Sequence, residues 1–454
     1  MGKVNNMFKK ILIANRGEIA VRIIRACNEM GIQTVAVYSE IDKDALHTQM
    51  ADEAVCIGPA KSKDSYLNMQ NILSATVLTG AEAIHPGFGF LSENSKFAQM
   101  CEECNIKFIG PDSHNIDNMG NKLKAREMMI KAGVPVVPGS DGAIEDETDA
   151  LRLAEGIGYP VMIKASAGGG GRGIRVITKA EELILAYNAA KTEAKTAFGD
   201  DTMYMEKFIE EPRHIEFQIL ADEHGNVIHL GERDCSIQRR NQKVIEEAPG
   251  AVMTEELRKQ MGEVAVKAAE SINYKNAGTI EFLLDKHGKY YFMEMNTRIQ
   301  VEHPITEMVT GVDLIKAQIK IASGQVLPYK QKDIKIEGHA IECRINAENP
   351  SKNFMPCPGE IKSLHIPGGY GVRIDSAAYQ GYKIPPTYDS MIGKLIVHGK
   401  DRDEAIRKMR RALGEFIIEG VDTNIDFQFR IINNGNYIKG NFDTSFISKE
   451  FGNL

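Results

Sequence analysis

The chain has 454 residues, of which 43% are hydrophobic and 26% are charged, the profile of an ordinary globular protein long enough for two to four domains. The formal net charge of -7 argues against a general nucleic-acid binder and against a protein that binds anionic membranes. No apolar run approaches the roughly 18 to 20 residues needed to cross a bilayer, and residues 1–10 lack the apolar core of a signal peptide. We therefore expect a cytoplasmic protein that binds neither nucleic acid nor membranes.

The seven cysteines are scattered along the chain, which does not indicate a disulfide framework. Cys101 and Cys104 have the spacing of a metal-binding pair. No second pair of cysteines or histidines follows them, so we interpret this spacing as incidental.

The first 115 residues predict an α/β domain. An apolar run at residues 10–14 is followed by apolar residues at helical spacing and by a second strand at residues 33–39. This order is typical of a doubly wound parallel sheet. The turn at Asn15–Glu18 lacks the glycine pattern of a dinucleotide site, and we interpret it as structural. A strand that runs into a glycine- and proline-rich loop at residues 81–94 is a better candidate for lining a ligand site.

A helical linker over residues 116–136 leads to a second unit over residues 137–208. Its central feature is a strand carrying Lys164, a turn with five glycines between residues 167 and 173, and a return strand at residues 174–177. Bare backbone N–H groups in such a turn can close over phosphates, although the Walker A pattern is absent. The alternative is a hairpin tip with no ligand. We expect the whole unit to move as a lid, because the glycines supply the freedom to hinge.

Two further units complete the predicted architecture, at residues 209–335 and 336–454. The third unit contains alternating strands and a charge-rich run at residues 231–247, for which a solvated face is an open alternative. The fourth unit is rich in predicted strands, and one of them, at residues 339–346, places Glu342 and Arg344 on one face. The fold class is therefore a multidomain combination of α/β and α+β units.

The stretch from Phe292 to His303 carries the strongest chemical signal. Its polar residues recur at every second position, so an extended chain would project them on one side: Glu294, Asn296, Arg298, Gln300 and Glu302. A turn at residues 285–288 pairs this stretch with the preceding strand, which carries Glu281. If the two strands are in register, Glu281 and Glu294 approach to roughly 5 Å and can share divalent cations. An ordinary edge strand with a charged, solvated face remains the alternative.

Together these motifs resemble the biotin carboxylase component of bacterial acetyl-CoA carboxylase, an enzyme of the ATP-grasp superfamily. The resemblance covers nearly the whole chain and is carried by residues 13–20, 85–94, 164–173, 232–240, 294–303 and 388–395. It implies an ATP-grasp lid over residues 137–208, an ATP-grasp core over 209–335 and a C-terminal biotin carboxylase domain over 336–454. It also implies two half-reactions, in which ATP and bicarbonate give carboxyphosphate and the carboxyl group then moves to biotin.

The resemblance also implies the role of each matching residue. ATP would be held by Lys122, Lys164, Gly168, Gly169, Gly170, Gly171, Glu206, Lys207, Ile209, His214, Gln238 and Asn241. Two Mg²⁺ or Mn²⁺ ions would bind Glu281, Glu294 and Asn296. Bicarbonate would bind Lys243, Arg298, Gln300, Val301 and Glu302, with Glu302 as the base, and Arg344 would stabilise the enolate-like oxygen of biotin. The sequence departs from the family at Asn241, where a histidine is expected, which puts the nucleotide contact at that position in doubt.

The chain contains no biotinyl-lysine motif, so we expect biotin to arrive on a separate biotin carboxyl carrier protein. The predicted partners are that carrier, the carboxyltransferase subunits of acetyl-CoA carboxylase and a second copy of the chain, with Arg22, Arg25 and Glu29 as candidate interface residues. Three alternatives remain open. The chain could serve a pyruvate carboxylase or another acyl-CoA carboxylase, it could be a different ATP-grasp ligase that joins a carboxylate to an amine or thiol, or it could be a nucleotide-sensing protein without turnover.

Overall fold

We analysed a computed structural model, which describes residues 7–167 and 173–452. The N-terminal part contains a five-stranded parallel sheet in the order β3-β2-β1-β4-β5. Its strands are β1 (Lys10–Ile13), β2 (Gln33–Ser39), β3 (Glu53–Gly58), β4 (Ala83–His85) and β5 (Lys107–Phe108), and its helices are α1 (Gly17–Glu29), α2 (Leu46–Met50), α3 (Met69–Thr79) and α4 (Ser95–Glu103). The predicted doubly wound sheet is therefore confirmed.

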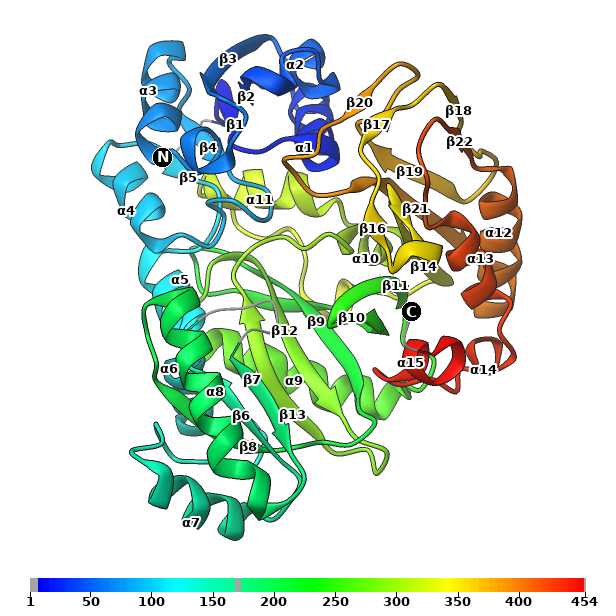
Figure 1. The fold of residues 1–454 in the computed structure, drawn as a ribbon. Coiled ribbons are helices and arrows are strands. Elements are labelled where there is room, and N and C mark those ends of the chain that lie inside the picture. The colour runs from blue at the N-terminus through cyan, green and yellow to red at the C-terminus, as the bar shows by residue number, and fades with distance from the viewer. Residues whose placement is uncertain (1–6, 168–172, 453–454) are drawn as a thin grey trace.

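Helices α5 (Ser113–Gly120) and α6 (Lys122–Lys131) connect this sheet to the smaller unit at the lower left of Figure 1. That unit is an antiparallel sheet, ordered β7-β6-β8, with two helices packed on it. Its elements are α7 (Glu147–Ile157), β6 (Val161–Ala165), β7 (Ile174–Ile177), α8 (Ala180–Phe198) and β8 (Met203–Lys207). It has a hydrophobic core of its own, which includes Ile163, Leu183 and Met205.

The central element is an eight-stranded sheet in the order β13-β12-β9-β10-β11-β14-β21-β19. Its strands are β9 (Arg213–Ala221), β10 (Val227–Arg239), β11 (Gln242–Ala248), β12 (Asn276–Leu284), β13 (Tyr290–Asn296), β14 (His339–Asn346), β19 (Val372–Ser376) and β21 (Met391–Gly399). Helices α9 (Glu255–Ser271), α10 (His303–Thr310) and α11 (Leu314–Ala322) follow strands of this sheet. Because β11 pairs with β14, the sheet continues across residue 335, where the sequence predicts a division between two units.

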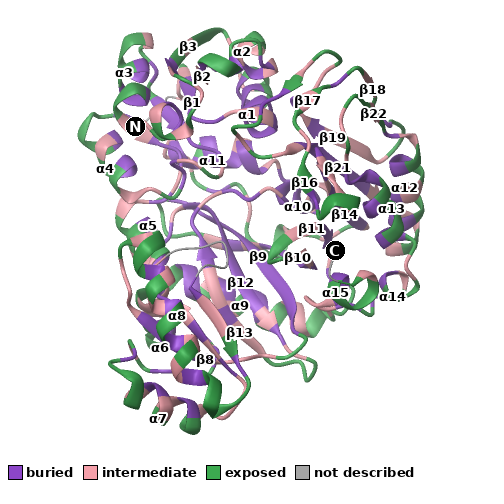
Figure 2. Ribbon diagram, viewed as in Figure 1, coloured by how far each residue is buried: buried purple, intermediate pink, exposed green. Residues whose placement is uncertain are grey.

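The charge-rich run at residues 231–247 is part of this sheet, so the alternative of a solvated face is wrong. Strands β10 and β11 bury most of the run, and the side chains of Arg233 and Glu246 have no exposed surface. Buried charges are tolerated only when paired and hydrogen-bonded, which already points to an organised polar interior. Figure 2 shows the same concentration of buried residues along β9, β10 and β12.

The C-terminal part adds short strands and helices around β19 and β21. These are β15 (Glu348–Asn349), β16 (Met355–Pro356), β17 (Gly359–Glu360), β18 (Ser363–His365), β20 (Lys383–Ile384), β22 (Ile417–Glu419), α12 (Arg402–Glu415), α13 (Ile425–Ile432), α14 (Gly435–Ile438) and α15 (Phe446–Phe451). Helix α12 packs on β14 and β21 through Ile406, Met409 and Leu413. Among the described helices, none has the length and apolar character required to span a membrane.

Candidate active site

Two glutamates face each other across the strand pair β12–β13. The register aligns Glu281 with Glu294, as predicted from the turn between the two strands. Glu281 is buried, whereas the side chain of Glu294 is one-third exposed and lies 3.3 Å from the ammonium of Lys122, at the start of α6. One carboxylate is thus embedded in the protein and its neighbour faces the approach to the site.

The stretch after Glu294 stays extended only as far as Asn296, so the prediction of one continuous alternating strand to Glu302 is wrong. Helix α10 begins at His303 with Pro304 in its first turn, where the missing N–H of proline costs nothing, and the chain must leave the sheet to reach it. The side chains nevertheless converge on Glu281 Oε1. Asn296 Nδ2 and Gln300 Nε2 both donate to it over 2.8 Å, and Arg298 reaches Asn296 Oδ1 at 3.0 Å.

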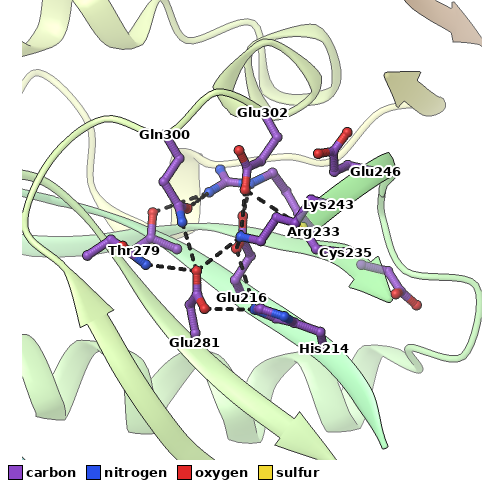
Figure 3. Close-up of polar contacts among 12 residues, drawn as sticks. His214, Glu216, Arg233, Cys235, Lys243, Glu246, Thr279, Glu281, Gln300 and Glu302 are labelled. Atoms are coloured by element: carbon purple, nitrogen blue, oxygen red, sulfur yellow. Dashed lines mark hydrogen bonds and ion pairs between the residues drawn. The ribbon is translucent and has the colours of Figure 1, made fainter. Parts of the chain in front are cut away.

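Lys243, on β11, lies at the centre of three buried carboxylates (Figure 3). Its Nζ is 2.5 Å from Glu216 Oε2, 3.0 Å from Glu281 Oε1 and 2.6 Å from Glu302 Oε1. Burial disfavours the charged form, but these carboxylates favour it more strongly, so the pKa of Lys243 lies well above its usual value. The ammonium is therefore a fixed positive charge that holds three acidic side chains in one place.

Glu302 connects this cluster to Arg344 on β14. Arg344 donates from NH2 to Glu302 Oε2 over 3.0 Å and from Nε to Glu246 Oε1 over 2.6 Å. Burial raises the pKa of Glu302, and Lys243, Arg344 and Arg233 together lower it by more, so the pKa lies below the normal range. Glu302 is thus ionised at neutral pH.

Arg233, on β10, organises the floor of the site and was not singled out from the sequence. The guanidinium is fully buried and donates to Glu216 Oε1 over 2.5 Å and to Gln300 Oε1 over 2.8 Å. It also contacts Gln218, Thr279 and Thr306. Because a guanidinium carries five donors in a fixed plane, one side chain orients residues from several strands and from helix α10.

Three residues of the site were not singled out from the sequence: Glu216, Arg233 and Glu93. The sequence signals that could have identified them differ in strength. Glu216 lies two positions after His214 on a strongly alternating strand, so period-two spacing indicates its orientation toward the site. Arg233 pairs with Glu216 through a ladder that contains a register shift, which the sequence does not reveal. Glu93, whose carboxylate is 2.8 Å from Arg298 Nε, comes from the loop at residues 81–94 that the sequence marked as a candidate ligand loop.

The residues predicted to hold a nucleotide occur on both sides of the connection between β8 and β9. Lys164 Nζ lies 2.5 Å from Glu206 Oε2, while Lys207 Nζ donates to the carbonyl oxygens of Gly158 and Tyr159. Half-buried Ile209 lies two residues after the end of β8. His214 Nε2 lies 2.8 Å from Glu281 Oε2, and its Nδ1 is 2.7 Å from Gln238 Nε2. Gly168, Gly169, Gly170 and Gly171 lie outside the described residues.

Asn241 occupies the exposed two-residue turn between β10 and β11. Arg239 pairs with Gln242, and the two turn residues, Arg240 and Asn241, have φ values of 50° and 62°. Asparagine tolerates this left-handed conformation better than most residues, which gives a backbone reason for its presence.

Two groups of three ligand-type side chains occur within the described part of the chain. They are His214, Glu216 and Glu281, and Glu216, Cys235 and Glu302, and within each group the ligand atoms lie within 4.8 Å of one another. Both groups contain Glu216, which Lys243 and Arg233 already neutralise. The predicted metal ligands form a different set, in which Glu281 and Asn296 are buried and the partly exposed Glu294 faces the approach to the site.

Comparison with known proteins identifies the family. Three family models match in succession: biotin carboxylase N-terminal domain at residues 7–116, carbamoyl-phosphate synthase L chain ATP-binding domain at 121–330 and biotin carboxylase C-terminal domain at 342–449. Biotin carboxylase 1 of Bacillus subtilis is 63% identical over 442 residues, covering 97% of this chain and 98% of the relative. The chain belongs to the biotin carboxylase family.

Other biotin carboxylase relatives serve different complexes. A pyruvate carboxylase subunit of Methanothermobacter thermautotrophicus is 58% identical over 443 residues, covering 98% of this chain and 90% of the relative. The biotin carboxylase domain dimer of Hydrogenobacter thermophilus 2-oxoglutarate carboxylase was solved with MgADP, ADP and bicarbonate. It matches with a TM-score of 0.95 and 54% identity over 98% of each chain. The resemblance stated from the sequence motifs and the predicted fold class are both confirmed.

Proposed function

We propose that this protein uses ATP and bicarbonate to carboxylate biotin on a separate carrier protein, as the biotin carboxylase component of acetyl-CoA carboxylase. The observation that carries this proposal is the position of Glu302. It is an ionised carboxylate held between Lys243 and Arg344, beside the carboxylate pair Glu281 and Glu294. Such a site can hold a small anion, remove its proton and place it against a metal-bound triphosphate.

The carboxylates and the amide around Glu294 fit a nucleotide with divalent cations. Mg²⁺ and Mn²⁺ prefer oxygen ligands, and Glu281, Glu294 and the amide oxygen of Asn296 supply them. The pKa of Glu281 is shifted upward by burial and downward, by more, by Lys243 and His214, so this carboxylate is ionised and able to coordinate. Bound cations would neutralise the triphosphate charge. Lys122 and Lys164 would contact phosphate oxygens, and His214 and Gln238 would lie near the ribose.

The first chemical step would occur between Lys243 and Arg298. Both cations reach Glu281, Lys243 directly and Arg298 through Asn296, and Gln300 adds an amide donor. A bicarbonate held by these groups and by the backbone of Val301 would transfer its proton to Glu302. Its oxygen would then form a bond to the γ-phosphorus as the bond to the ADP oxygen breaks, giving carboxyphosphate. Positioning and charge neutralisation account for most of the acceleration of such transfers.

In the second step the bond between the carboxyl carbon and the phosphate oxygen of carboxyphosphate would break, the released phosphate would take the proton of the ureido nitrogen of biotin, and that nitrogen would form a bond to the carboxyl carbon. Negative charge develops on the ureido oxygen when that nitrogen loses its proton. Arg344 is the cation on β14 that reaches the site, and it would stabilise this oxygen. The lid over residues 137–208, with its separate hydrophobic core, would close over the reacting groups and exclude water.

The carrier and the carboxyltransferase subunits belong to the proposal. The relative from Bacillus subtilis is a biotin carboxylase, which is consistent with acetyl-CoA carboxylase, and the pyruvate carboxylase subunit from Methanothermobacter thermautotrophicus favours the alternative of another biotin-dependent carboxylase. Carboxylation assays with purified carriers of each class would distinguish them, because only the cognate carrier would be labelled efficiently. The cytoplasmic location remains a prediction.

We also propose that the chain forms a homodimer through the outer face of α1. A hollow of about 420 Å³ lies there, lined by Arg22, Arg25, Glu29, Glu307, Gly311, Val312, Asp313, Arg373, Ile374 and Asp375. Arg25 and Glu29 are exposed and available to a second copy, whereas Arg22 is held by Glu307 and Asp313 within the chain. The dimer reported for the Hydrogenobacter thermophilus relative supports a homodimer, and the exposed charges of α1 are the reason for proposing this face.

The decisive test is a Glu302→Gln variant, because glutamine keeps the shape of the side chain but cannot accept the proton. We expect bicarbonate-dependent ADP release to fall by about 100-fold or more, the effect of removing a general base, while nucleotide binding measured by calorimetry is retained. The matched control is Glu270→Gln, an exposed position on α9, which should leave both measurements unchanged. Full activity in Glu302→Gln would exclude this residue as the base.

A further inference from the structure

Two glutamates lie side by side behind Arg344, and the proposed reaction does not use either of them. Glu246 on β11 and Glu342 on β14 are partners in the antiparallel ladder, so their side chains project from the same face of the sheet. Neither side chain has any exposed surface. Glu342 is also the residue that the sequence places on one face with Arg344.

The cations on this face are already engaged. Arg344 donates to Glu246 Oε1 and to Glu302 Oε2. Lys394, the partner of Arg344 on β21, donates to the carbonyl oxygen of Val301 over 2.8 Å and pairs with Glu18 at 3.1 Å. Within the described residues, both oxygens of Glu342 and Oε2 of Glu246 lack a hydrogen-bond partner.

Two adjacent carboxylates without a cation between them cannot both stay ionised in a dry environment. Burial is the largest cause that raises the pKa of Glu342 well above its normal value, and it raises the pKa of Glu246 to about 7 despite the proximity of Arg344. The other groups that face Glu342 do not reverse this. Lys394 and Arg344 lower the pKa of Glu342, but by less than burial raises it, and Glu246 and Glu302 add further negative charge. Helix α12 packs on the opposite, apolar face of β14.

We propose that Glu246 and Glu342 share a proton at neutral pH and that this pair positions Arg344 for biotin. The inference rests on the proposed function, since it assigns Arg344 to that substrate. With the proton in place, Arg344 has one ionised partner in the sheet, Glu246, and divides its donors between Glu246 and Glu302. Loss of the proton adds a second carboxylate behind the guanidinium, which draws the guanidinium toward the sheet and away from the substrate.

This arrangement predicts that high pH weakens the use of biotin but not the use of ATP. As pH rises and the pair loses its proton, the KM for free biotin should increase, whereas the KM for ATP should not follow. In a Glu342→Gln variant the neutral amide reproduces the protonated form. Its KM for biotin should therefore remain within about twofold between pH 6.5 and 9, while the wild-type value rises about threefold or more over the same range.

The state of the pair can be measured without activity. Infrared difference spectroscopy of the wild type at pH 7 should show the carbonyl band of a protonated carboxyl group, and this band should be missing in Glu342→Gln. Thermal unfolding of the variant establishes that it folds. The matched control is Glu232→Gln, which removes another buried glutamate that pairs with Arg258 and has no contact with Arg344. The control should keep both the band and the wild-type pH dependence.

Three outcomes distinguish the proposed function, the shared proton and the positioning of Arg344 from one another. If the wild type carboxylates no biotin under any condition, the proposed function fails, while the infrared band still tests the shared proton. If biotin is carboxylated but Glu342→Gln retains the band, the pair does not hold a proton and the inference is overturned. If the band disappears but the pH dependence of the KM for biotin is unchanged, the pair does not position Arg344, and that part of the proposal is overturned.

Discussion

At the scale of single residues, the site is organised by two buried cations of different character. Lys243 is a compact charge that gathers Glu216, Glu281 and Glu302. Arg233 carries a planar guanidinium whose N–H donors fix the orientation of side chains from β9, β12 and the segment before α10. The lysine therefore sets the charge of the site, and the arginine sets its geometry.

Replacing Arg233 with methionine should displace the side chains that it orients without removing a group that reacts. Glu216 would lose a 2.5 Å partner in a fully buried position but would keep Lys243, so the loss of unfolding free energy should stay below about 3 kcal/mol, the lower end of the range for an unpaired buried charge. Gln300 would also lose its anchor, so the KM for bicarbonate should rise about tenfold while nucleotide affinity changes little. Steady-state kinetics with bicarbonate and ATP varied separately would show this split.

The matched control for Arg233 is Arg258→Met. Arg258 also makes a bidentate contact with a buried glutamate, Glu232, but it is partly exposed, and Glu232 is not among the proposed bicarbonate ligands. It should lose stability without a change in the KM for bicarbonate. Equal kinetic effects in the two variants would show that the role of Arg233 is only structural.

At the scale of elements, the sequence predicts local structure well and long-range pairing poorly. The strands β1, β2, β6 and β7 and the helix α6 appear where the apolar spacing indicates them, since that signal lies within a few residues. The turn at residues 285–288 fixes the register of Glu281 with Glu294 for the same reason. The charged run at residues 231–247 could not be assigned from its own residues, because its burial depends on strands distant in the sequence.

The same limit applies to the candidate site. Lys243, Arg298, Gln300 and Glu302 were assigned through the family resemblance, and the structure brings them together around Glu281 through a loop instead of the predicted strand. Their individual roles in the reaction remain predictions. The contact between Glu246 and Glu342 required the ladder between β11 and β14, which joins residues almost 100 positions apart.

At the scale of elements, β11, β14 and α12 are joined through the buried carboxylate of Glu247, and this contact predicts a pH-dependent stability. Glu247 accepts from His339 at 3.0 Å and from Arg402 at 2.8 Å. Burial raises its pKa, and Arg402 and His339 lower it by more, to about 2. A depressed carboxyl pKa stabilises the fold above the unfolded-state value near 4.5, and that contribution of about 3 kcal/mol is lost as pH falls toward 2.

In thermal unfolding, Glu247→Gln should therefore lower the melting temperature most at pH 6 to 7. The difference from the wild type should shrink as pH falls through the interval between about 4.5 and 2. Glu419→Gln, at an exposed position on β22, is the control and should shift the melting temperature little at any pH. A difference that stays constant down to pH 3 would contradict the assignment of this pH dependence to Glu247.

At the scale of the whole molecule, the N-terminal sheet is attached to the C-terminal part by a buried polar contact. Arg16, in the turn after β1, forms a bidentate pair with Asp42 at 2.6 and 2.8 Å and lies over the ring of Tyr388 at 4.3 Å. Its NH2 also reaches the hydroxyl of Tyr382 at 3.3 Å. A turn that the sequence marks as structural thus joins two parts of the chain almost 370 residues apart.

Replacing Arg16 with alanine should loosen this attachment. Asp42 is 2% exposed and would lose its bidentate cation while keeping the hydroxyl of Tyr66, a loss of about 3 to 5 kcal/mol. Lysine should rescue only part of this loss, because it keeps the charge but not the bidentate geometry. Amide hydrogen exchange should increase in β20 and β21 and in the N-terminal strands, but not in α7 and α8, which belong to a separate core.

Arg411→Ala removes an exposed pair with Glu415, worth at most about 1 kcal/mol, and provides the comparison. If the two alanine variants gave the same exchange pattern, Arg16 would not be what holds the N-terminal sheet to the C-terminal part.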